Sequence, residues 1–343
     1  MTEWVGTTSD TANAGHTDVD IVVLTHIPYM SGYHKFKLDV LKVCLESIRR
    51  HTRTDYRLLV FDNGSSPVVQ DYLNREFADG RLHSLIRSER NIGKIGAFQM
   101  IFRALQGTYA AYFDDDVYAY PGWLEAHLEI LNTYPQVGMV SGSAIRERFS
   151  HAIESNLCFA EQHAEVELLR GRFLPETTER EFVESTGRWW PHYYEATAAI
   201  QDIQLTYRGV SAYAAANHFQ FVAPVAVMRE ALPVEWSGRL MGQMRELDER
   251  IDDLGYLRLS TMERCTRHMG NQLSPEYQPL LEELGVSCVR RSRSALVIFL
   301  RRVLVKLPGL KRLNAWLNKQ LYGALERKAA YGNLALNNRG DGA

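Results

Sequence analysis

Three consecutive aspartates follow a short apolar run, a position in which carboxylates can bind a metal ion. Asp114, Asp115 and Asp116 come directly after residues 109–113, which have the composition of a buried strand. Carboxylates two positions apart at the end of a strand can converge on Mg²⁺ or Mn²⁺, whose remaining ligands are then substrate phosphates. The pattern predicts a divalent-metal site at Asp114 and Asp116. The alternative is a strand that merely ends in acidic residues.

A glycine-containing segment at residues 91–97 is suited to a close approach by an anionic ligand. Gly93 and Gly96 have no side chains, and the helix expected to begin here presents backbone N–H groups that favour a diphosphate. Asn91 and Lys94 add polar side chains to the same segment. The first glycine of the dinucleotide-binding fingerprint is missing, which disfavours nicotinamide dinucleotides. A glycine-rich turn that caps the helix is the other interpretation.

Two further polar residues end predicted strands. Asp62 ends residues 57–62 and is followed by the turn at residues 63–66, and Thr25 ends residues 20–25. The carboxylate of Asp62 can accept hydrogen bonds from a nucleotide base or a ribose, although the segment could also be a plain turn.

Short β-rich runs alternate with amphipathic patterns through the first half of the chain, which predicts an α/β fold with a mostly parallel sheet flanked by helices. The predicted strands are residues 20–25, 57–62, 82–87, 109–113, 137–141 and 219–227, and the predicted helices are residues 38–51, 93–105, 122–134 and 240–254. In such sheets ligands bind at the carboxyl ends of the strands. The polar residues above should therefore meet at one edge.

In their order and spacing, these segments resemble the inverting glycosyltransferases of family 2, over about residues 20–271. The resemblance implies a Rossmann-like GT-A fold, a nucleotide-sugar donor, with UDP-sugars favoured, and Mn²⁺ or Mg²⁺. It implies that Asp62 contacts the nucleotide base. It implies that Asp114 and Asp116 form a DxD pair in which Asp116 is the direct metal ligand. It also implies that the donor site is lined by Thr25, Asp115 and residues 91–97.

The resemblance extends to an acidic segment at residues 246–253 and to a late histidine. It implies that Asp248 or Glu249 is the catalytic base, with Asp248 preferred, and that His268 is a further metal or diphosphate contact. A solvated acidic helix face would also explain the acids. A structural role is the alternative for the histidine.

Aromatic residues between 189 and 194 predict an acceptor site. Trp189, Trp190 and Tyr193 could stack on a sugar ring of a glycan or lipid-linked acceptor, and core packing is the alternative. Polysaccharide synthesis is one setting in which such an acceptor occurs.

Charge is distributed unevenly along the chain. Residues 290–328 hold eleven Lys or Arg and one Glu, a net charge of +10, which leaves −12 for the rest of a chain whose total is −2. This basic amphipathic tail predicts contact with an anionic membrane surface or packing in a homo-oligomer, and its apolar runs are too short to cross a bilayer. The acidic body disfavours nucleic-acid binding.

We therefore expect a leader at 1–17, a donor-binding half at 18–145, an acceptor-binding and catalytic half at 146–289, and a helical tail at 290–343. A cytoplasmic enzyme, peripheral on the inner membrane face, fits the absence of a signal-peptide pattern and four widely spaced cysteines. Two alternatives are a nucleotidyltransferase, which should carry a basic Gly-rich loop after the first strand, and a non-catalytic nucleotide- or sugar-binding protein.

Overall fold

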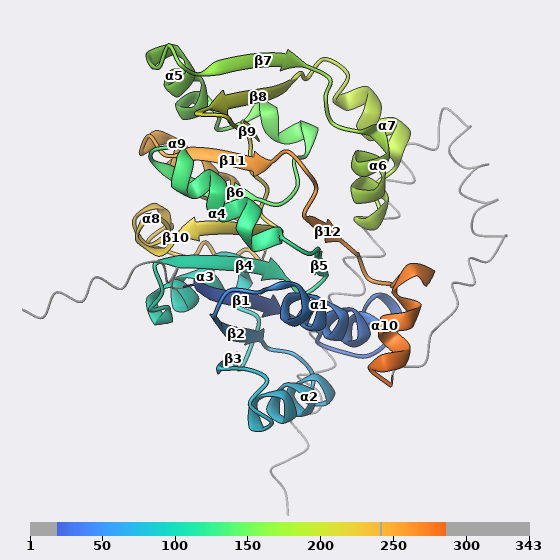
Figure 1. Cartoon of the computed structure of the whole chain (residues 1–343). Coiled ribbons are helices and arrows are strands. Elements are labelled where there is room, and N and C mark those ends of the chain that lie inside the picture. Colours follow the sequence, from blue (N-terminus) through green and yellow to red (C-terminus); the bar gives the residue numbers. More distant parts are fainter. Residues whose placement is uncertain (1–18, 241, 286–343) are drawn as a thin grey trace, which may run out of the picture. The chain divides into compact units, whose positions relative to one another are not determined.

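A ten-stranded mixed sheet organises residues 19–240 and 242–285, the part of the chain that the computed structural model describes (Figure 1). The strand order is β3 (Ser84–Ser88), β2 (Tyr56–Asn63), β1 (Val19–Thr25), β4 (Tyr109–Asp114), β10 (Gln220–Pro224), β6 (Val137–Ser141), β11 (Leu257–Thr261), β9 (Val210–Tyr213), β8 (Asp202–Tyr207) and β7 (Glu167–Gly171). Only β10, β9 and β7 run against the other seven strands of this sheet. The prediction of a mostly parallel sheet is confirmed.

Helices cover both faces of this sheet (Figure 1). They are α1 (Lys37–His51), α2 (Pro67–Ala78), α3 (Gly93–Ala104), α4 (Trp123–Thr133), α5 (Glu154–Gln162), α6 (Glu176–Ser185), α7 (Trp190–Ala196), α8 (Val225–Ala231), α9 (Met244–Asp253) and α10 (Gln278–Glu283). Successive residues of a strand point to opposite faces. Accordingly, Ile21 and Val23 of β1 pack in the cluster that contains α1, α2 and α4, whereas Val22 packs in the cluster that contains α3, α8 and α9.

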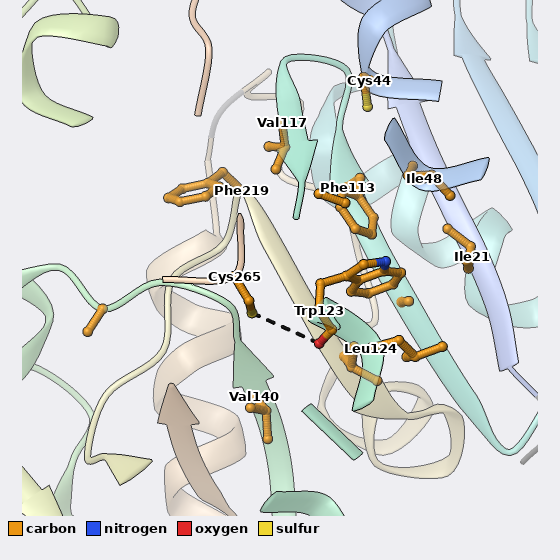
Figure 2. Packing of buried hydrophobic residues seen from close by; sticks show 14 of the residues in the cluster. Ile21, Cys44, Ile48, Phe113, Val117, Trp123, Leu124, Val140, Phe219 and Cys265 are labelled. Carbon is orange, nitrogen blue, oxygen red and sulfur yellow. Dashed lines mark hydrogen bonds between the residues drawn. The ribbon is translucent and has the colours of Figure 1, made fainter. Parts of the chain in front are cut away.

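The end of β4 is anchored by aromatic packing. The rings of Phe113 and Trp123 meet edge to face with centroids 4.9 Å apart, and both side chains are fully buried (Figure 2). The Trp123 ring nitrogen donates a hydrogen bond of 3.1 Å to Oγ1 of Thr52, at the end of α1. Edge-to-face aromatic pairs add stability beyond the area they bury. The three aspartates that follow Phe113 therefore start from a rigid strand end.

Two predicted elements depart most from the structure. The apolar run expected to be a strand at residues 219–227 is divided into β10 and α8, because Pro224, with φ −62°, precedes the first turn of the helix. The helix expected from residue 240 begins at Met244, after Gln243, whose φ is +66°. Apolar character in these segments indicated burial correctly, since Val225, Val227 and Met244 are buried.

Residues 150–215, where no element was predicted, contain α5, β7, α6, α7, β8 and β9. Cys44, Cys158 and Cys265 form no disulfide among the described residues, and Cys158 is exposed. Among residues 19–240 and 242–285, no helix has both the length and the apolar character needed to cross a bilayer. The predicted leader at 1–17, the fourth cysteine and the basic tail at 290–343 lie outside the described residues.

Candidate active site

The predicted polar edge is present at the carboxyl ends of β2, β1 and β4. In the register of these parallel strands, Thr25 lies opposite Asp62 and Leu24 lies opposite Asp114. Thr25 Oγ1 donates a 2.7 Å hydrogen bond to Oδ2 of Asp115. Residues far apart in the sequence are thus brought to one edge, as expected for a ligand site in an open α/β sheet.

Two lysines form ion pairs with the three aspartates at 114–116, which we call the acid cluster. Lys37 Nζ lies 2.7 Å from Oδ1 of Asp115 and 2.9 Å from Oδ2 of Asp116, and Lys94 Nζ lies 2.7 Å from Oδ1 of Asp114. Burial opposes the charge on Lys37, but the carboxylates of Asp115 and Asp116 raise its pKa above the ordinary value. Buried charges are tolerated when they are paired in this way. Lys37 was missed from sequence because a lysine near a helix start gives no signal of its own.

His268 approaches the acid cluster from a second, two-stranded sheet. β12 (Thr266–His268) pairs with β5 (Val117–Ala119) and sets His268 opposite Val117. As a result, His268 Nε2 lies 3.4 Å from Oδ1 of Asp116, and Nδ1 lies 2.8 Å from Oγ of Ser185. Burial opposes ionisation of Asp116, yet His268 and Lys37 lower its pKa to about 2. The structure thus brings together two of the three residues predicted to bind the metal, Asp116 and His268.

The donor chemistry of this pair fits a divalent cation. A carboxylate and an imidazole held by a hydrogen bond at its other nitrogen are a common ligand combination. Within the described ranges no group of three or more His, Cys, Asp or Glu is arranged around a cation site. A metal held by Asp116 and His268 would need further ligands from a diphosphate and water, as is usual for cations bound with phosphates.

Asp62 keeps one carboxylate oxygen without a hydrogen bond. Its side chain is fully buried, and Oδ1 accepts a 2.9 Å hydrogen bond from the backbone N–H of Ser65. Oδ2 has no hydrogen-bond partner within the described residues, and the nearest cation, Nε of Arg87, lies 3.9 Å away. A buried acceptor without a donor is unfavourable unless a ligand supplies one. This orphan oxygen is therefore a candidate contact for a nucleotide base.

The glycine-containing segment is tied to the turn after β2. Asn63 Nδ2 donates to Oδ1 of Asn91 at 3.1 Å, and the same Asn91 oxygen accepts from the backbone N–H of Gly93 at 2.8 Å. A Cβ atom at Gly64, which has φ +79°, would lie 2.8 Å from the carbonyl carbon of Arg90. Only glycine satisfies both the left-handed φ and this close approach.

The start of α3 is covered by the loop before α9. The backbone N–H of Lys94 donates a 3.0 Å hydrogen bond to the carbonyl of Leu240. A Cβ atom at Gly93 would lie 2.8 Å from the ring nitrogen of Trp236. Gly96 also faces Trp236. The close approach predicted for a diphosphate at these glycines is made here by residues 236–240, while Lys94 reaches the acid cluster with its side chain.

Asp248 is fully buried and is held by two partners. Its side chain has no exposed surface; Oδ2 lies 2.5 Å from Nε2 of His218, and Oδ1 lies 2.5 Å from Nη2 of Arg258. Burial opposes its ionisation, but Arg258 and His218 lower its pKa below the ordinary value. Glu249, by contrast, is half exposed on α9 and pairs with Arg245 at 3.0 Å. Sequence reasoning missed His218 and Arg258.

The three predicted acceptor-binding aromatics have different environments. Trp189 is 54% exposed, whereas Tyr193 is 5% exposed and donates its hydroxyl proton to Oε1 of Glu179 at 3.0 Å. Trp190 lies against Tyr193, with ring centroids 5.8 Å apart, and packs on the core. Tyr193 therefore holds α7 on α6, and Trp189 is the member that is free to stack on a ligand.

Comparisons with known proteins point to one family. Residues 33–181 match the family described as Glycosyl transferase family 2. This range contains Asp62, residues 91–97 and the acid cluster. No curated protein matches the sequence.

Solved structures with similarity to this chain include two complexes with a nucleotide sugar and one with UDP and a free sugar. Mannosyltransferase PcManGT from Pyrobaculum calidifontis, with GDP-Man and Mn²⁺, is 19% identical over 37% of this chain and 36% of that chain, with a TM-score of 0.31. GalNAc-T7 with UDP, GalNAc and Mn²⁺ is 12% identical over 73% and 42%, with a TM-score of 0.44. S. aureus TarS 1–349 with UDP-GlcNAc is 15% identical over 38% and 34%, with a TM-score of 0.29. The matched regions thus span less than half of each of these structures.

Proposed function

We infer that this chain, whose residues 33–181 match glycosyl transferase family 2, is an enzyme that transfers a sugar from a nucleoside diphosphate to an acceptor hydroxyl. The observation that carries the proposal is the coincidence of the family match with the polar sheet edge. The acid cluster and Asp62 lie in the matched range, at the carboxyl ends of β4 and β2, the two strands that flank β1. We propose that the reaction inverts the configuration at the anomeric carbon.

The buried oxygen of Asp62 supports a uridine donor. Uracil carries an N–H group that can donate to a carboxylate, whereas cytosine has an acceptor at the equivalent ring position. Oδ2 of Asp62 is buried and has no donor within the described residues. Thymine and guanine also carry a ring N–H, so this oxygen disfavours a cytidine donor, and the family resemblance leads us to propose a UDP-sugar among the others. Thr25 and Asp115 would form the adjoining wall through their 2.7 Å hydrogen bond.

Asp116 and His268, with Asp114 beside them, are the residues that would hold Mn²⁺ or Mg²⁺. Such a cation stabilises the negative charge that develops on the departing nucleoside diphosphate. Lys94 donates hydrogen bonds to Asp114 and to the carbonyl of His218. Lys37 donates hydrogen bonds to Asp115 and Asp116. These lysines limit repulsion among the carboxylates and hold them in place for the incoming phosphates.

The acceptor and the base are proposed from the second half of the domain. Trp189, exposed beside α7, is suited to stack on a sugar of a glycan or lipid-linked acceptor. Of the two carboxylates predicted as the base, we favour a role in proton transfer for Asp248 over Glu249, because Glu249 forms an ion pair with Arg245 on an exposed helix face. The acceptor oxygen attacks the anomeric carbon as its proton is removed, and the bond to the diphosphate breaks.

The basic segment at residues 290–328 supports a membrane-surface location, and with it a lipid-linked acceptor. Replacing Arg301 and Arg302 with Glu in the full chain should weaken its binding to phosphatidylserine vesicles, measured by co-sedimentation. Equal binding of both proteins would rule out this role for the tail.

A panel of donors tests the proposed function. Wild-type protein is incubated with UDP-, GDP- or dTDP-sugars and Mn²⁺ or Mg²⁺, and the release of nucleoside diphosphate is followed. Release from one donor class, with an inverted product by NMR, is the expected result. Pyrophosphate release from a nucleoside triphosphate and a sugar phosphate would instead identify a nucleotidyltransferase. Thermal stabilisation by a nucleotide with no turnover, even with acceptors supplied, would indicate a binding protein.

A further inference from the structure

Asp248 has no surface with which to touch an acceptor. Its side chain is 0% exposed, and its two oxygens are engaged by His218 and by Arg258, itself 1% exposed. The guanidinium of Arg258 is fixed further by the carbonyls of Ala152 and Ala216, at 2.9 and 3.2 Å. A carboxylate sealed by such contacts can act on the reaction only through a neighbour that reaches the site.

His218 is that neighbour. Its Nε2 lies 2.5 Å from Asp248, and its side chain retains 10% exposure. The other ring nitrogen, Nδ1, has no hydrogen-bond partner among residues 19–240 and 242–285. It is not among the fully buried atoms that lack a partner, so it keeps some exposed surface. Nε2 is thus held by the carboxylate of Asp248, and Nδ1 is available to a ligand.

The backbone around His218 is joined directly to the acid cluster. The carbonyl of His218 accepts a 2.8 Å hydrogen bond from Nζ of Lys94, which also contacts Asp114. The next carbonyl, of Phe219, accepts from the backbone N–H of Asp114 at 2.8 Å. The Phe219 ring meets His268 edge to face, with centroids 5.5 Å apart. His218 therefore connects the acid cluster, through Lys94, with Asp248 on α9.

The protonation state of the pair suits base catalysis. Burial lowers the pKa of His218 to about 4, against the opposing effect of Asp248, so the ring is neutral at pH 7. Nε2 carries the proton and donates a hydrogen bond to the carboxylate of Asp248. In that tautomer Nδ1 has a free lone pair. An aspartate that orients a histidine in this way is a known arrangement for activating a hydroxyl group.

Building on the proposed glycosyl transfer, we propose that His218 is the catalytic base and that Asp248 is a positioning residue acting through it. Nδ1 of His218 takes the proton of the acceptor hydroxyl while that oxygen forms a bond to the anomeric carbon. The bond between that carbon and the diphosphate oxygen breaks, and the nucleoside diphosphate leaves with the electron pair. Arg258 keeps Asp248 ionised throughout.

Hydrolysis of the donor, with water as the acceptor, tests this assignment without a known acceptor. The variants are His218→Gln, whose amide can still donate to Asp248, His218→Ala with and without added imidazole, and Asp248→Asn. Nucleotide release gives kcat and KM, and calorimetry gives UDP affinity in the presence of Mn²⁺. Glu129→Gln, an exposed carboxylate on α4, is the matched control.

We expect His218→Gln and His218→Ala to lose at least about 100-fold in kcat, with donor KM and UDP affinity within about threefold of wild type. Imidazole should restore part of the His218→Ala rate and none of the smaller loss in Asp248→Asn. Retention of kcat by His218→Gln, together with full loss in Asp248→Asn, would overturn the assignment in favour of Asp248 as the direct base. Loss of UDP affinity in folded His218→Gln would show a structural role. Wild-type protein that binds UDP and never releases it from a donor would count against the proposed function itself.

Discussion

Nε2 of His268 lies 3.4 Å from Oδ1 of Asp116, and Nδ1 of the same ring lies 2.8 Å from Oγ of Ser185. The contact depends on the pairing of β12 with β5, which sets the histidine beside the strand end that carries the acids. A ring fixed at one nitrogen presents the other in a defined direction, a common feature of metal-binding histidines.

Changing His268 to Ala should therefore weaken Mn²⁺ binding in the presence of UDP by about tenfold or more, and Ser185→Ala should cause a smaller loss. The affinity is measured by calorimetry or by the Mn²⁺ EPR signal. Glu129→Gln is the control, because this exposed side chain should leave the affinity unchanged. Equal Mn²⁺ affinity in His268→Ala and wild type would remove His268 from the metal site.

Lys37 should be essential for stability as well as for the site. Replacing it with Met leaves Asp115 and Asp116 without their buried cation, which should cost about 3 kcal/mol in the free energy of unfolding. Chemical denaturation measures this loss. Because a divalent cation could substitute for the missing charge, Mn²⁺ should raise the melting temperature of Lys37→Met more than that of wild type. A variant as stable as wild type, and insensitive to Mn²⁺, would show that the lysine is not needed to balance these carboxylates.

The orphan oxygen of Asp62 predicts a switch in base preference. Wild type should bind UDP more tightly than CDP, because only uracil offers an N–H to a carboxylate at that ring position. In Asp62→Asn the amide can keep the bond from the Ser65 N–H through its oxygen and present an NH₂ group where Oδ2 was. We expect UDP affinity to fall about tenfold and CDP affinity to rise, by calorimetry. Parallel losses for both nucleotides would contradict a direct contact with the base.

The positions of the strand ends could be predicted from the sequence, because each depends on a short local pattern of residues. Apolar β-rich runs end at Thr25, Asp62 and Asp114, and short connections between parallel strands bring such ends to one edge. The glycine-containing segment was predicted correctly as a helix start. Its packing against Trp236 was not, because the loop that covers it comes from much later in the chain.

The charged partners of the site could not be predicted for the same reason. Lys37 and Arg258 each lie in ordinary local patterns, one on an amphipathic helix and one on a strand, where long basic side chains are commonly solvated. Their burial depends on the tertiary arrangement, which places β11 between β6 and β9 and packs α1 against β5. Only the folded chain shows that each neutralises an aspartate.

His127 predicts a pH dependence of stability that is separate from the site. Burial lowers its pKa to about 4, while the unfolded value is near 6.5, so the folded protein holds the ring neutral against Gln220 and the carbonyl of Trp123. Its contribution to stability is fully present above pH 6.5 and is lost as pH falls towards 4, because the unfolded chain takes up a proton first. The loss at pH 5 is about 2 kcal/mol.

Removal of the imidazole should abolish this part of the pH dependence. His127→Gln should be less stable than wild type at pH 7.5, and the gap should narrow by about 2 kcal/mol at pH 5 in urea denaturation. A gap that stays constant between these pH values would mean that His127 is protonated to the same extent in both states.

The most direct test of the central claim is the metal dependence of nucleotide release from a sugar donor by wild type, Asp116→Asn and Glu129→Gln. Each protein is titrated with Mn²⁺ at a fixed concentration of the donor that wild type accepts. The account predicts that wild type and Glu129→Gln release nucleoside diphosphate with the same dependence on Mn²⁺, and that Asp116→Asn loses most of the release at every concentration. Full activity in Asp116→Asn, or release that is unaffected by chelation of the metal, would contradict the assignment of the acid cluster as the donor and metal site.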